Sequence, residues 1–159
     1  MTHLTIVTVG SLKERYFTEA IGEYKKRLSA YARVEEIELK EERIADEDQP
    51  AHVRAALAAE GERILKAIPK DAYTIALCVE GAAYDSVALS SIIGQAADAS
   101  GKIALVIGSS HGLDPSVKAA CYLRLSVSKL TFPHQLMRVM LYEILYRSFT
   151  ILHGKRYHK

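Results

Sequence analysis

Apolar residues recur along this chain in two spacings that alternate from one end to the other. Short apolar runs such as Ile103–Ile107 indicate buried strands, and stretches with apolar residues three and four positions apart indicate helices. The predicted strands are Leu4–Val9, Val34–Leu39, Tyr73–Val79, Ile103–Ile107 and Leu123–Val127. The predicted helices are Lys13–Leu28, a helix opened by Pro50, Val87–Ala97, Pro115–Ala120 and Pro133–Leu152. This alternation predicts an α/β fold with a mostly parallel sheet and helices on both of its faces.

Two segments depart from this simple alternation. Val34–Leu39 intersperses apolar residues with glutamates, which favours a less buried strand at an edge of the sheet. Lys40–Gln49 is dense in charge and has no apolar period, so it is predicted to be a loop. Gly61 is expected to weaken the helix opened by Pro50, because glycine costs helix stability.

Composition indicates one globular domain over residues 1–159. The chain is 49% hydrophobic, and a domain of this size buries roughly 68–70% of its unfolded surface. No stretch approaches the ~20 apolar residues of a membrane span, and the first residues do not resemble a signal peptide, so a cytoplasmic protein with no membrane partner is expected. Cys78 and Cys121 lie in apolar segments, which favours buried free thiols over a disulfide or a metal pair.

Charge is distributed unevenly between the two halves. Residues 1–62 contain 9 Lys or Arg against 13 Asp or Glu, whereas the remainder contains 12 against 6. The basic half would attract an anionic partner such as nucleic acid, because phosphate attraction depends on local positive charge. Ordinary solvation of the surface accounts for the same asymmetry equally well.

Three predicted strands are followed by residues suited to a binding pocket. Glu80-Gly81 follows the third strand, Gly108–Gly112 the fourth, and Ser128–Thr131 the fifth. Ligands of open α/β sheets bind beyond the carboxyl ends of strands, and glycine allows backbone to approach a ligand closely. Each glycine alone indicates only a turn, but the three segments together predict a pocket.

Gly108-Ser-Ser-His-Gly112 also matches the Gly-x-Ser-x-Gly pattern of serine hydrolases. That interpretation places the nucleophile Ser110 in a tight strand-to-helix turn. Asp114 and Pro115, however, are typical of an N-cap and first helical residue, so the helix is expected to begin several positions later. The loop also lacks the Gly-Lys-[Ser/Thr] ending of a P-loop, and no Gly-x-Gly-x-x-Gly occurs. Hydrolysis and dinucleotide binding are therefore disfavoured.

Five separated landmarks carry a resemblance to a known family. They are Leu77-x-x-x-Gly81, Ile107-Gly108-x-x-x-Gly112-Leu113, the Leu125–Pro133 loop, the helix from Leu136 to Arg147, and the terminal Tyr157-His158. In this order and spacing the chain resembles, over its whole length, the ribosomal RNA large-subunit methyltransferase H family of the SPOUT class.

The resemblance implies a C-terminal trefoil knot and a pocket for S-adenosylmethionine, with no metal. By position, the methyl donor would contact Leu77, Gly108, Val127, Ser128, Lys129, Leu130, Thr131 and Phe132. The implied acceptor is N3 of a pseudouridine in 23S ribosomal RNA, in a stem-loop at the subunit interface of the assembled ribosome. A noncatalytic ribosome-binding or assembly factor on the same fold is the alternative function.

The last part of the chain carries the remaining expectations. The resemblance places Tyr157 and His158 at the acceptor, where His158 is the candidate base because histidine titrates near neutral pH. Lys155, Arg156 and Lys159 would contact phosphate. The helix Pro133–Leu152 is apolar nearly all round, which predicts a homodimer through this helix; a helix buried centrally within a monomer is the alternative.

Overall fold

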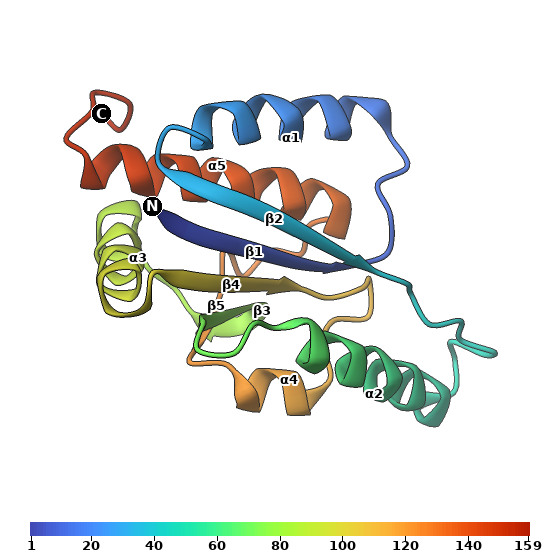
Figure 1. Ribbon diagram of the computed structural model, residues 1–159. Helices are drawn as coiled ribbons and strands as arrows, with labels where there is room; N and C mark the ends of the chain where they lie inside the picture. Colours follow the sequence, from blue (N-terminus) through green and yellow to red (C-terminus); the bar gives the residue numbers. More distant parts are fainter.

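The computed structural model covers residues 1–159 and contains five strands and five helices in strict alternation (Figure 1). In chain order the elements are β1 (Thr2–Val9), α1 (Arg15–Leu28), β2 (Ala32–Leu39), α2 (Pro50–Ala67), β3 (Tyr73–Ala82), α3 (Ser86–Ser100), β4 (Lys102–Ile107), α4 (Pro115–Ala120), β5 (Leu123–Leu125) and α5 (His134–Leu152). Every predicted element is present, and the charged loop at 40–49 has no helix or strand.

The five strands form one sheet in the order β2-β1-β4-β3-β5, and every neighbouring pair is parallel. The predicted edge position of the glutamate-rich strand is therefore confirmed for β2. Its neighbour β1 is buried from Leu4 to Val9, whereas only Ala32 of β2 is fully buried. Charged side chains on an edge strand discourage pairing with another chain.

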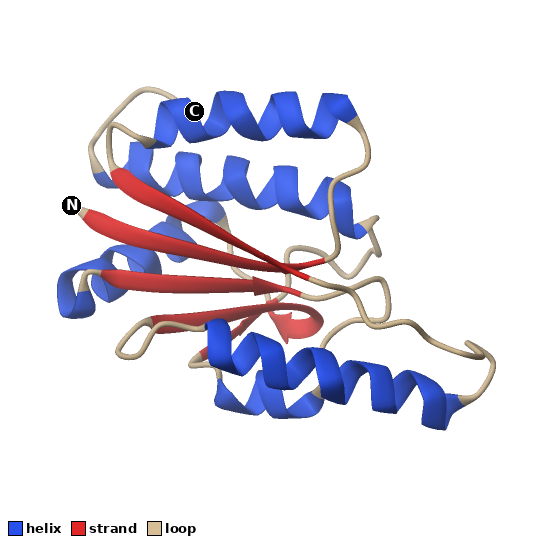
Figure 2. Cartoon of the chain, turned by 45° about the vertical axis from the view of Figure 1, so that its right-hand side comes forward, coloured by secondary structure: helices blue, strands red, loops and turns tan.

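Helices cover both faces of the sheet. Figures 1 and 2 show α1, α3 and α5 on one face and α2 with α4 on the other. The larger buried cluster packs side chains of α1, α3 and α5 on β1, β3 and β4, and includes Leu4, Ile75 and Leu105. The smaller cluster joins Val7 and Val106 to Ile64 of α2 and to residues of α4. Alternate side chains of one strand therefore supply two separate cores.

Helix α5 lies against the sheet between α1 and α3. Leu141, Tyr142, Leu145 and Phe149 are at most 2% exposed, so this chain alone covers much of the helix. The two flanking helices therefore cover part of the α5 surface within one chain. Several other apolar residues of α5 remain partly exposed, among them Met140, Ile144 and Ile151.

Two expected strand boundaries need correction, and the glycine inside α2 has a packing role. Helix α2 runs unbroken through Gly61, where an added Cβ would lie 3.0 Å from the Cβ of Asp114; the glycine permits close packing on the start of α4. Strand β3 extends to Ala82, so Glu80-Gly81 belongs to the strand rather than following it. Leu125 pairs with both Leu77 and Ala82, because residues 78–81 bulge out of the ladder. Strand β5 is shorter than predicted and ends at Leu125.

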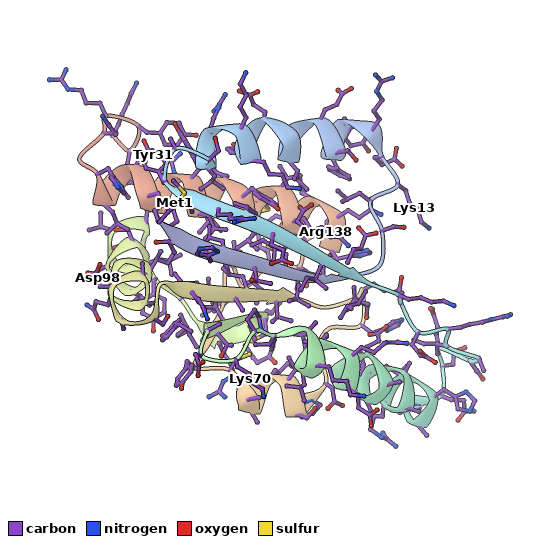
Figure 3. All side chains as sticks on the ribbon, viewed as in Figure 1. Met1, Lys13, Tyr31, Lys70, Asp98 and Arg138 are labelled. Atoms are coloured by element: carbon purple, nitrogen blue, oxygen red, sulfur yellow. The ribbon has the colours of Figure 1, made fainter.

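A buried arginine anchors the first turns of α5. The Arg138 side chain is 5% exposed and donates to Glu38 Oε2 at 3.0 Å and to the carbonyl oxygens of Val9 and Gly10. Figure 3 shows Arg138 at the same end of the sheet as Lys13, whose backbone N–H donates to Gln135 Oε1 at 3.0 Å. Helix α5 is thereby tied to the carboxyl ends of β1 and β2.

Candidate functional site

A pocket opens at the carboxyl ends of β3 and β4, beside the beginning of α5. Ten of its 19 lining residues are hydrophobic, and the others include several hydroxyl-bearing residues and two glycines. The lining residues are Leu77, Cys78, Val79, Glu80, Ile107, Gly108, Ser109, Ser110, Gly112, Leu113, Lys118, Leu125, Val127, Ser128, Leu130, Thr131, Phe132, His134 and Met137. Such a mixture of apolar walls and a few polar groups is typical of small-molecule sites. We call it the strand-end pocket.

The loop after β4 forms one wall of the strand-end pocket and depends on two glycines. Gly112 N donates to Ser109 O at 2.9 Å, which closes a tight turn, and Gly112 has a φ of +93°. A Cβ added at Gly108 would lie only 2.2 Å from the carbonyl oxygen of Gly112. The turn therefore excludes a side chain at position 108.

The serine-hydrolase interpretation of this loop finds no support in the geometry. Asp114 accepts from Ser116 N at 3.0 Å and caps α4, as the sequence predicted. Its carboxylate is thus engaged at the helix end. Ser110 makes no hydrogen bond to a histidine or a carboxylate, and His111 contacts Glu47 instead, at 3.4 Å.

Residues 127–132, which we call the 127–132 loop, form the opposite wall. Its fold is set locally: Ser126 Oγ donates to Ser128 O at 3.1 Å, and Leu130 N donates to Ser128 Oγ at 3.0 Å. Leu130 is 69% exposed although it lines the pocket. A large exposed apolar side chain in a pocket wall is suited to contact a ligand.

The structure brings together seven of the eight residues expected to contact the methyl donor. Leu77, Gly108, Val127, Ser128, Leu130, Thr131 and Phe132 all line the strand-end pocket. Lys129 lies in the same loop but does not line the pocket. The seven lining residues come from three separate parts of the chain: β3, the end of β4 and the 127–132 loop.

Three further lining residues escaped the sequence interpretation. Lys118 of α4 forms an ion pair with Glu80 at the pocket rim, and this hydrogen bond holds the pKa of Glu80 below its usual value. His134 and Met137 lie in the first turn of α5. Both residues follow closely on the 127–132 loop in the sequence, and that proximity was the available signal.

The end of the chain, Gly154–Lys159, folds back onto α5, and we call it the tail. Tyr157 donates from its hydroxyl to Glu143 Oε2 at 2.7 Å, and its ring packs edge-on against Tyr146 with centroids 4.8 Å apart. Arg147 lies 4.7 Å from the centre of the Tyr157 ring and contacts His158 Nδ1 at 3.2 Å. Tyr157 and His158 are thus brought together by α5.

Glu143 is the centre of this cluster. Arg147 donates to Glu143 Oε1 from Nη2 at 2.6 Å and from Nε at 2.9 Å. Burial by itself raises the pKa of Glu143, but hydrogen bonds from Tyr157, Tyr24 and Arg147 outweigh it and lower the pKa. The same hydrogen bond to Glu143, with burial, raises the pKa of Tyr157. The carboxylate is therefore charged and the phenol protonated at neutral pH.

The tail does not reach the strand-end pocket of its own chain. Neither Tyr157 nor His158 lines that pocket. Arg147, which holds His158, instead lines a neighbouring hollow that shares Leu125 and Val127 with the strand-end pocket.

The structure offers no candidate metal centre and no candidate membrane span. No group of three or more His, Cys, Asp or Glu side chains could hold a metal ion. None of the helices combines the length and apolar content needed to cross a bilayer.

Comparisons with known proteins agree with one another. Residues 2–158 match the family model described as "Predicted SPOUT methyltransferase". Proteins named ribosomal RNA large subunit methyltransferase H are similar over nearly their whole length. The one from Shouchella clausii is 47% identical and covers 99% of each chain, and the one from Moorella thermoacetica is 45% identical and covers 100% of each. A solved structure of a probable methylase family protein from Haemophilus influenzae has a TM-score of 0.56 at 15% identity, covering 98% of this chain and 70% of that one, and it shares the fold.

Proposed function

The chain belongs to the ribosomal RNA large-subunit methyltransferase H family of SPOUT methyltransferases, and from that premise we propose that it methylates large-subunit ribosomal RNA. The observation that carries the proposal is the strand-end pocket. Seven residues expected at a methyl donor, distant in sequence, line this one cavity.

The proposed methyl donor is S-adenosylmethionine, bound in the strand-end pocket. Leu77, Leu130 and Phe132 supply apolar surface suited to the purine, and Ser128 and Thr131 supply hydroxyl groups suited to polar atoms of the donor. The donor brings a methyl group on a sulfonium, which is already a strong electrophile. The protein's main contribution is therefore to hold the acceptor nitrogen in line with that methyl.

The proposed acceptor is N3 of a pseudouridine in 23S ribosomal RNA, in the assembled ribosome of the cytoplasm. The names of the similar proteins support a ribosomal RNA acceptor. The excess of basic residues beyond residue 62 supports an anionic partner. Within the tail, Lys155, Arg156 and Lys159 are exposed and suited to contact phosphate.

Because neither Tyr157 nor His158 lines the strand-end pocket of its own chain, we propose a homodimer in which the tail of one copy completes the pocket of the other. Methyl transfer requires reacting atoms about 3–3.5 Å apart, so a tail residue that acts on the acceptor must lie beside the bound donor. Four large apolar side chains are each at least 41% exposed in the single chain, namely Val79, Tyr84, Val87 and Leu130. Exposed apolar side chains of this kind are expected to be covered by a second copy in the dimer. Light scattering is expected to give twice the 17.6 kDa of one chain, and a mass of one chain would refute the dimer.

We also propose that the C-terminal part threads into the trefoil knot of the SPOUT class. Its support is the close contact between β5 and the end of β3: Ser126 N donates to Ala82 O at 2.9 Å. A Cβ on Gly81 would lie 2.6 Å from Arg124 O. Stretching the molecule by its two ends is expected to stop short of the length of an untied 159-residue chain, and reaching that full length would contradict the knot.

The function is tested by incubating purified protein with ribosomes from cells that lack it and with isotopically labelled S-adenosylmethionine. Digestion and mass spectrometry of the 23S RNA are expected to reveal one labelled methylpseudouridine. Ribosomes that bind the protein tightly but gain no methyl would instead identify a noncatalytic ribosome-binding factor. Calorimetry with S-adenosylhomocysteine checks the pocket separately, and absence of binding would refute the donor assignment.

A further inference from the structure

The contact between Arg147 and His158 fixes which imidazole nitrogen carries a proton. Arg147 Nη1 lies 3.2 Å from His158 Nδ1. A guanidinium has five N–H donors and no acceptor, and it stays protonated in proteins. The Nδ1 atom must therefore accept, which places the proton of the neutral imidazole on Nε2.

The position of Arg147 is itself held from the opposite side. Its Nε and Nη2 atoms bind the Glu143 carboxylate, and the Tyr157 ring covers the guanidinium at 4.7 Å. With Nη1 directed to His158, all three guanidinium nitrogens have partners in one cluster. Tyr157 also donates to Glu143, so a single carboxylate orients both tail residues.

Nε2–H of His158 is the group left for the acceptor. The side chain is exposed, and its only hydrogen bond within the chain is through Nδ1. An Nε2 that already bears a proton cannot remove one from the substrate, but it can donate a hydrogen bond. This differs from the role of base expected from sequence.

We infer that His158 acts as a hydrogen-bond donor to a carbonyl oxygen of the acceptor imide, and that Glu143 is a positioning residue acting through Arg147 and Tyr157. The inference rests on the proposed function and specifies the chemistry of its acceptor end. An imide nitrogen lies between two carbonyl groups, and when it loses its proton the negative charge spreads onto their oxygens. A donor aimed at one of those oxygens stabilises the charge as it develops.

The reaction balances without a protein base. N3 releases its proton to solvent water, and the resulting anion attacks the methyl carbon. The bond from carbon to the sulfonium sulfur breaks as the bond from carbon to N3 forms. Sulfur keeps the electron pair of the broken bond and becomes a neutral thioether. His158 keeps its own proton throughout and lowers the free energy of the imide anion.

The experiment compares His158→Gln with His158→Ala in the dimeric enzyme acting on ribosomes. A glutamine amide can place an N–H near the position of Nε2, but it cannot take up a proton at neutral pH. We expect His158→Gln to retain methyl transfer within about tenfold of wild type and His158→Ala to lose roughly 10²–10³-fold, the cost of removing one oxyanion donor. The rise of kcat/KM with pH should be the same in wild type and His158→Gln, because it reports the acceptor alone.

The opposite pattern would overturn the inference. If His158 is a base, His158→Gln is as slow as His158→Ala. In both variants the rise of kcat/KM with pH that is due to His158 in the wild type is then absent. Because His158 is exposed, neither variant should alter folding. Failure of the wild-type protein to methylate would overturn the proposed function instead, so the two failures are distinguishable.

The positioning role of Glu143 is tested by a double-mutant cycle with Tyr157→Phe. If Glu143 acts through the tail, Glu143→Gln lowers kcat, and adding Tyr157→Phe lowers it by less than the product of the two single effects. If the double variant instead loses kcat by the full product of the two single effects, the positioning role of Glu143 is overturned. Glu23→Gln is the matched control, because Glu23 forms a similar i,i+4 pair with Arg27 at 3.1 Å on α1.

Discussion

Substitution of Gly108 by alanine is the most direct test of the strand-end pocket. The new Cβ would lie 2.2 Å from Gly112 O, 2.7 Å from Gly112 C and 2.9 Å from Leu113 Cδ2. Carbon atoms in contact are most stable about 3.5–4.0 Å apart, so the turn must open by on the order of 1 Å. Because two of these three neighbours are backbone atoms, no change of rotamer relieves the contact.

The expected effect has a stability part and a functional part. Overpacking of a close-packed site costs about 1–3 kcal/mol, and at this chain length the melting temperature should fall by roughly 2–12 °C. The loop should also lose the Gly112–Ser109 hydrogen bond that shapes the pocket wall. A displacement of ~1 Å in an active site can cost about 100-fold in rate. We therefore expect methyl transfer to fall about 100-fold and binding of S-adenosylhomocysteine to weaken at least about tenfold.

Scanning calorimetry measures the first part, and titration calorimetry with S-adenosylhomocysteine measures the second. Gly22→Ala is the matched control, because an added Cβ there has no neighbour within 4 Å and the residue lies inside α1. It should raise stability by up to about 1 kcal/mol and leave binding unchanged. Binding by Gly108→Ala within about twofold of wild type would refute the assigned pocket geometry.

Three further variants test other parts of the molecule. Arg138→Met should lower the free energy of unfolding by about 1–3 kcal/mol in urea, because it leaves the carbonyl groups of Val9 and Gly10 without this donor; an unchanged free energy of unfolding would contradict the anchoring role. Leu130→Ala should keep the wild-type melting temperature, since the side chain is 69% exposed, but bind S-adenosylhomocysteine about tenfold more weakly; unchanged binding would exclude contact with the ligand. Glu143→Gln should be less stable than wild type above about pH 5. Because the folded-state pKa of Glu143 lies below its ordinary 4.5, this difference should shrink as the pH falls through that lowered value, and a difference independent of pH would contradict it.

The fold was largely predictable because each element carries its own periodicity. The uninterrupted apolar run Ile103–Ile107 indicated a strand buried on both faces, and β4 lies inside the sheet. The glutamates of β2 marked the edge of the sheet correctly. Asp114 and Pro115 likewise marked the start of α4. These signals are local, so they can be recognised in the sequence without knowing which other segments pack against each element.

What could not be predicted depends on contacts between distant segments. An added Cβ at Gly61 of α2 would lie 3.0 Å from the Cβ of Asp114 beside α4, and no local sequence pattern reports that close approach. The bulge at 78–81 is defined by Leu77 and Ala82 both pairing with Leu125, a residue more than 40 positions further along the chain. Of the site, glycines and strand ends indicated the pocket, whereas the roles of Lys118 and Glu143 required side-chain positions.

The order of the strands has a consequence for synthesis of the protein. Strand β4 lies between β1 and β3, and β5 pairs only with β3. A growing chain can therefore pair β1 with β2, but β3 stays without a partner until β4 has been made. Translation adds about 5–20 residues per second. In a nascent chain of this protein β3 therefore waits about 1–5 s for synthesis of β4, and the binding pocket forms only when translation is nearly complete.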